Sequence, residues 1–94
     1  MQFRVSDMYG LSTAHPPFGM RGQVLGNDVP RPGMEMRAGH LRAPLTDVEA
    51  TPLPEEGGAG YFLTIMCSDR AEQHAWQAAV TAAGYTIEIA APAV

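Results

Sequence analysis

Four residues within one short stretch carry side chains suited to holding an anion. The chain contains six arginines and no lysine, and its only local basic cluster lies between residues 31 and 42. An arginine guanidinium is a planar fork of N–H donors that matches a carboxylate or a phosphate. The cluster predicts a ligand- or partner-binding surface formed by Arg31, Arg37, His40 and Arg42. The alternative is a set of scattered surface arginines, each paired with a nearby carboxylate.

A thiol and an imidazole offer a second kind of chemistry. Cys67 is the only cysteine, and His74 follows it across the junction between a predicted strand and a predicted helix. A thiol just before a helix N-terminus can have a lowered pKa, and the thiolate is the reactive form. Cys67 and His74 are therefore the candidate pair for a small thiol-dependent enzyme or redox sensor. The alternative is that Cys67 is a small core residue, as free cysteines usually are.

Two carboxylates and three histidines complete the set of residues that can do chemistry. Asp47 and Glu49 are two positions apart, so on a strand both point to one face. Under a cleft they could do acid–base work; otherwise they form a solvated face that discourages aggregation. The histidines have no close spacing to one another or to Cys67, so we expect no metal site and no cofactor.

The elements that position these residues are predicted to be mainly short strands. Phe3 and Val5 alternate with polar residues, the pattern of a half-buried strand that runs to about Tyr9. A continuous apolar run over residues 61–67 predicts a central strand buried on both faces. The remaining strands are predicted at residues 18–25, 34–37, 45–49 and 85–89.

One helix is predicted between the last two strands. Asp69 and Glu72 have the spacing of a capping box, and Gly84 is placed to end the helix. The apolar stripe between them is Trp76, Val80 and Ala83. The order strand, helix, strand leaves room for a crossover, which is compatible with parallel pairing of the two strands.

Together these elements predict one mostly β domain over residues 1–94. The expected architecture is a small barrel of about five to seven strands. One C-terminal α-helix, at about residues 70–83, packs on it through Trp76 and Val80 and is followed by a final strand.

Composition narrows the classes of partner. The formal net charge of −4 disfavours binding to nucleic acid, which requires a basic surface. A lone cysteine excludes an intramolecular disulfide. Neither a basic-then-apolar leader nor a run of about 18 apolar residues is visible, so we expect a cytoplasmic protein without a membrane segment.

Several segments share a pattern of glycines and apolar residues with a known family. They are residues 18–26, 30–36, 46–49 and 55–60, the last leading into the apolar residues 61–65. Residues 3 to about 69 thereby resemble the β-barrel second domain of translational GTPases such as elongation factor Tu. Met20 stands where the family has the first glycine of a Gly-Arg-Gly triplet, which leaves only Arg21 and Gly22. The resemblance implies a barrel fold and, in the family, contacts to a GTPase domain and to the aminoacyl end of tRNA.

The leading hypothesis is a non-catalytic binding or interaction module that docks on a partner protein or self-associates. Its expected surfaces are the stretch from Arg31 to Arg42 and the proline-rich residues 52–56. One alternative is the thiol chemistry of Cys67 and His74. The other is a translation- or RNA-associated factor, which the resemblance alone implies.

Overall fold

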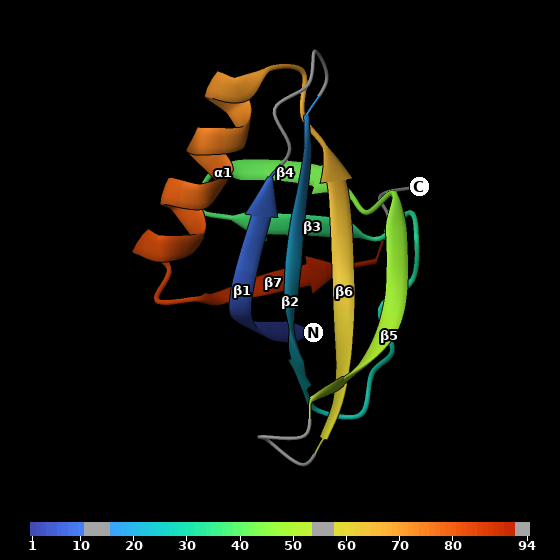
Figure 1. Cartoon of the computed structure of the whole chain (residues 1–94). Coiled ribbons are helices and arrows are strands. Elements are labelled where there is room, and N and C mark those ends of the chain that lie inside the picture. The colour runs from blue at the N-terminus through green and yellow to red at the C-terminus, as the bar shows by residue number, and fades with distance from the viewer. Residues whose placement is uncertain (11–15, 54–57, 92–94) are drawn as a thin grey trace.

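The computed structural model describes residues 1–10, 16–53 and 58–91. Within these ranges the chain forms seven strands and one helix (Figure 1). The strands are β1 (Gln2–Gly10), β2 (Pro17–Leu25), β3 (Glu35–Ala38), β4 (Leu41–Pro44), β5 (Asp47–Leu53), β6 (Gly58–Met66) and β7 (Thr86–Ala90), and the helix is α1 (Arg70–Ala82). The predicted fold class is confirmed: a mostly β chain with a C-terminal helix and a final strand.

All seven strands belong to one sheet in the order β4-β3-β7-β1-β2-β6-β5, and every pair of neighbours is antiparallel. Strand β7 lies between β1, where Phe3 is opposite Ile87, and β3, where Met36 is opposite Ile89. The strands that flank the helix, β6 and β7, are therefore not paired with each other, and the parallel pairing considered from the sequence is wrong. Both sides of β6 are taken by β2 and β5, so β7 pairs with the open edges of β1 and β3 instead.

The sheet curls because its two outermost strands are joined by a very short link. Only Leu45 and Thr46 separate β4 from β5, and such a link spans at most about 11 Å. The Thr46 amide donates to the Thr64 carbonyl oxygen of β6 at 2.8 Å, and the Leu45 amide donates to the Met34 carbonyl oxygen at 2.8 Å. In Figure 1, β1, β2, β6 and β5 form a front layer, with β7, β3 and β4 crossing behind it. The result is a curled half-barrel.

The core lies between these two layers and the helix. Phe3 and Met20 reach it from the front layer, Ile89 from the back layer and Trp76 from α1, and each is at most 1% exposed. Full burial of an aliphatic or aromatic side chain of this size contributes about 1.5–3 kcal/mol. One continuous cluster of such residues therefore holds the helix and both layers together.

The helix begins and ends where the sequence predicts. The Asp69 carboxylate accepts the Glu72 amide at 2.9 Å, and the Glu72 carboxylate accepts the Ser68 amide at 3.2 Å. At the other end the Gly84 amide donates to the Thr81 carbonyl oxygen at 3.1 Å, and the Tyr85 amide donates to that of Val80 at 3.0 Å. These two bonds form a Schellman motif.

The buried stripe of the helix lies one turn nearer the helix N-terminus than predicted. Trp76 and Val80 are buried as expected, but Ala83 is exposed and Gln73 is buried in its place. The chain leaves the helix at Ala83 toward β7, which takes this residue off the packed face. The Gln73 amide is accommodated because its Nε2 donates to the Pro17 carbonyl oxygen at 3.0 Å.

Candidate functional site

The thiol of Cys67 is part of the core. Cys67 is 3% exposed and belongs to the central hydrophobic cluster. Burial raises the pKa of this thiol, and the carboxylates of Glu72 and Asp69 raise it further. The expectation that the Cys67 thiol has a lowered pKa is therefore wrong. Desolvation and the two carboxylates raise this pKa by more than the nearby helix N-terminus lowers it. Within the described residues no hydrogen bond joins Cys67 to His74.

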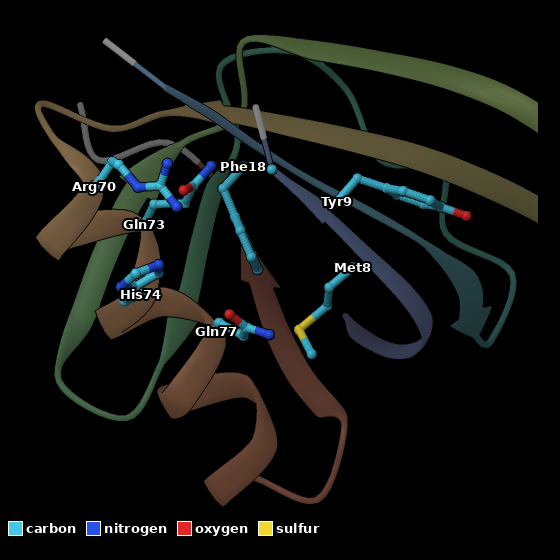
Figure 2. A pocket seen from close by; sticks show the side chains of 8 residues that line it. Met8, Tyr9, Phe18, Arg70, Gln73, His74 and Gln77 are labelled. Carbon is cyan, nitrogen blue, oxygen red and sulfur yellow. The ribbon is translucent and has the colours of Figure 1, made fainter. Parts of the chain in front are cut away.

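His74 instead borders a small hollow between α1 and the ends of β1 and β2 (Figure 2). The hollow has a volume of about 190 Å³, and its polar wall comes from α1. That wall consists of Arg70, Gln73, His74 and Gln77. A Cβ on Gly10 would overlap the side-chain amide of Gln73, so the helix packs directly against the β1 backbone. The Gln73 amide thus tethers the helix to the sheet here.

Two of the four predicted anion-binding residues come together. Arg37 of β3 and Arg42 of β4 are directly opposite each other, and both line a hollow of about 430 Å³. The Arg37 Nε donates to Glu35 Oε1 at 2.7 Å, and its Nη1 lies 3.6 Å from Glu88 Oε1. Arg37 is therefore already compensated by two carboxylates.

The other two lie at opposite ends of β3. Arg31 is in the loop before β3, where its carbonyl oxygen accepts the Met34 amide at 3.2 Å. His40 is in the turn after β3 and faces the alanine side of α1 across a separate hollow. The four side chains thus do not form one cluster.

A β-bulge in β1 determines what the outer face of the front layer presents. The pairing of β1 with β2 shifts between Val5, opposite Gly22, and Asp7, opposite Arg21. The extra residue, Ser6, reverses the phase, because side chains alternate faces along a strand. If Ser6 were paired in a regular ladder, Tyr9 would share the core face with Val5. With it, Tyr9 is on the outer face and is 47% exposed.

Tyr9 meets the ring of Phe62 on this face, above a glycine. The two ring centroids are 5.6 Å apart, and the ring planes are inclined by 32°. Gly19 lies directly opposite Tyr9, and a Cβ there would come within 2.8 Å of the Phe62 ring. We call the surface formed by Tyr9, Gly19, Phe62 and Thr64 the aromatic shelf. It borders an apolar hollow of about 340 Å³, and Figure 2 shows Tyr9 pointing away from the helix.

Charged side chains flank the aromatic shelf on both sides. On one side the Arg21 Nη2 lies 2.5 Å from Asp7 Oδ2. On the other side Glu49 of β5 is directly opposite Phe62, and Asp47 is directly opposite Thr64. Both carboxylate residues are exposed, and in the described part of the chain neither has a cation within 4.0 Å. The aromatic shelf is therefore bordered by acidic groups that are available to a ligand.

Sequence reasoning missed this surface for two reasons. The run at residues 61–67 was predicted to be buried on both faces, yet within it only Leu63, Ile65 and Cys67 are buried. Tyr61, Phe62 and Thr64 are half-buried, and Met66 is exposed. This prediction is wrong because, among the residues that the structure describes, no layer covers the outer side of β6. The bulge at Ser6 has no clear sequence signal. In the run at residues 61–67, apolar side chains on the two faces of β6 follow one another without a break. The sequence therefore does not show that one of these faces is open to solvent.

Some predicted features lie outside the described residues. Of the proline-rich surface at residues 52–56, residues 54–56 are outside, and Pro52 and Leu53 are in β5. His15 is also outside. Across residues 1–10, 16–53 and 58–91, no group of three or more histidine, cysteine, aspartate or glutamate residues could hold a metal ion. In the same ranges no helix is long and apolar enough to cross a membrane.

Comparison of the chain with known protein families, with curated proteins and with solved structures finds no match in any of the three.

Proposed function

We propose that this protein is a non-catalytic binding module and that the aromatic shelf is its contact surface. The observation that carries the proposal is the Tyr9–Phe62 ring pair, in which Tyr9 is exposed and Phe62 is half-buried, held over Gly19 on the outer face of the sheet. Aromatic rings on an open face beside a hollow present apolar contact area, and aromatic residues are enriched where proteins bind partners.

The shelf is also preorganised, which reduces the ordering cost of binding. Tyr9 and Phe62 are carried by neighbouring strands of one sheet, not by loops. Their contact with each other restricts both rings before any ligand arrives. A partner that covers them gains apolar contact without having to order the site.

Thiol chemistry is supported less well than binding. The Cys67 side chain is in the core, and its raised pKa favours the protonated form, which is the poor nucleophile. The relation to the second domain of translational GTPases remains a proposal based on the glycine and apolar pattern in residues 3 to about 69. Self-association remains a proposal too.

The experiment is a titration of isotope-labelled protein, followed by amide NMR signals. The probes are maltohexaose, indole, and blocked single amino acids with proline, phenylalanine or arginine side chains. We expect at least one probe to shift the amides of Gly10, Gly19 and Thr64, which border the hollow. Tyr9→Ala and Phe62→Ala should each weaken that probe by about tenfold.

The matched control is Val29→Ala, because Val29 is apolar and 53% exposed but lies in the loop between β2 and β3. It should leave probe affinity unchanged. The proposal fails if no probe shifts the three shelf amides, or if the shifts persist in both aromatic variants.

A further inference from the structure

One row of residues on the outer face contains two acidic side chains, and only one of them is paired with an arginine. Asp7 is directly opposite Arg21, Arg21 is opposite Phe62, and Phe62 is opposite Glu49. The row therefore reads acid, arginine, aromatic, acid across four strands. The first acid, Asp7, is paired with an arginine, because Arg21 Nη2 lies 2.5 Å from Asp7 Oδ2. The last acid, Glu49, has no arginine partner within the described residues.

The neighbouring row places a second carboxylate at the same edge. Tyr9, Gly19, Thr64 and Asp47 are successive partners across β1, β2, β6 and β5. Asp47 and Glu49 thus project from the same face of β5. Side chains directly opposite each other on a sheet have Cβ atoms about 4.5–5.5 Å apart. A group lying on the Phe62 ring is therefore within reach of Glu49.

We propose that the aromatic shelf binds an extended, arginine-bearing segment of a partner protein, with a guanidinium lying on the Tyr9–Phe62 rings and forked onto Glu49 or Asp47. This inference rests on the proposed function and adds the chemistry of the partner. A guanidinium stacks on aromatic faces and pairs bidentately with carboxylates. The shelf supplies the aromatic rings, and Glu49 and Asp47 of the neighbouring strand β5 supply the carboxylates.

Charge complementarity selects this occupant over the others. A second copy that presented the same face would bring three carboxylates, those of Asp7, Asp47 and Glu49, and a single arginine, Arg21, which is already paired with Asp7. The phosphates of a nucleic acid would be repelled by Asp47 and Glu49 in a chain of net charge −4. A neutral sugar or ring compound would use the rings but gain no ion pair from the two carboxylates.

The test uses the full chain and a blocked peptide in which arginine alternates with alanine. Affinity is measured by calorimetry, and the contact is mapped by the amide signals of Gly19, Thr64 and Glu49. Replacing each arginine by citrulline, a neutral isostere, should weaken binding by about tenfold or more, as loss of a charge-assisted hydrogen bond does. Higher salt should also weaken binding, because exposed pairs are screened.

Glu49→Gln and Asp47→Asn separate the charge from the shape of the site. We expect Glu49→Gln to weaken the arginine peptide by about fivefold to tenfold, and Asp47→Asn to weaken it by a smaller factor. Asp28→Asn is the matched control, because Asp28 is an exposed acid in the loop between β2 and β3. Its affinity should match that of the unmodified protein. All of these side chains are exposed, so the variants should fold.

Three outcomes would overturn the inference. In the first, the arginine and citrulline peptides bind equally. In the second, the arginine peptide binds but shifts amides near Glu35 and Glu88 instead of those on the shelf. In the third, maltohexaose or indole shifts the shelf amides and the arginine peptide does not; the arginine chemistry is then wrong, while the shelf as a binding surface stands. If no probe of either kind reaches the shelf, both proposals fail.

Discussion

Two glycines of β2 differ in what a methyl group would meet. At Gly19 the new Cβ would approach the Phe62 ring at 2.8 Å, and that ring is half-buried on the outer face and can move. At Gly22 it would overlap the backbone carbonyl oxygen of Arg4 and approach the buried Phe3 ring at 2.8 Å. Gly19 therefore leaves room for the Phe62 ring of the aromatic shelf, whereas Gly22 allows β1 and β2 to pair closely.

This difference gives a prediction at the scale of single residues. Gly22→Ala should lower the free energy of unfolding by about 3 kcal/mol, because the strand backbone must shift. Gly19→Ala should change it by less than about 1 kcal/mol, yet should displace the Phe62 ring from Tyr9. Denaturant unfolding measures the first effect, and aromatic ring-current shifts in NMR spectra measure the second. Equal loss of stability in the two variants would contradict this assignment.

Cys67 gives a prediction about pH. Its pKa is raised from the ordinary value of 9.0 by burial, with Glu72 and Asp69 adding to the effect. The folded state therefore holds this proton more tightly than the unfolded state. Its contribution to stability is fully present below pH 9.0 and is lost as the pH rises through the folded pKa. Cys67→Ala should flatten this decline in denaturant unfolding curves, and a thiol reagent at neutral pH should react very slowly with native protein.

At the scale of elements, the bulge in β1 sets the face on which Tyr9 lies. In the unmodified chain Asp7 is opposite Arg21 and Tyr9 is opposite Gly19. Deleting Ser6 should remove the bulge and leave both pairs in place, because only the unpaired residue is lost. We expect the deletion variant to fold, to lose less than about 2 kcal/mol, and to retain the Tyr9–Phe62 contact in NMR spectra. Deleting Met8 instead should turn Tyr9 toward the core and abolish that contact. If both deletion variants kept the Tyr9–Phe62 contact, or both lost it, the bulge would not determine the face on which Tyr9 lies.

Elements with strong local signals could be predicted from sequence, and elements defined by distant pairing could not. The helix follows from Asp69, Glu72 and Gly84, which act within one or two turns. Strand β4 (Leu41–Pro44) was not predicted, because four residues ending in proline carry no readable alternation. The strand order was not predicted either, since Arg4 of β1 pairs with Thr86 of β7, and every other pair between these two strands is still further apart in sequence. Register and the bulge together produce the aromatic shelf, so the shelf could not be predicted.

At the scale of the whole molecule, the basic cluster shows why nearness in sequence is a weak guide to a site. Arg37 and Arg42 are directly opposite each other because a turn brings β3 and β4 together. Arg31 and His40 are separated by the full length of β3, although they lie in the same stretch of sequence. The aromatic shelf draws instead on β1, β2 and β6, whose shelf residues span more than half of the chain.

The position of β7 in the sheet has a consequence for how the protein is made. Ribosomes release the amino-terminal strands first, so β1 to β6 emerge before β7. Until then the pair β3–β4 and the layer β1–β2–β6–β5 share no ladder, and each presents an open edge of the kind that invites pairing with other chains. Ile87 and Ile89 of β7 are also missing from the core. In the described part of the chain, β7 is therefore the strand that joins the pair β3–β4 to the layer β1–β2–β6–β5 into one sheet.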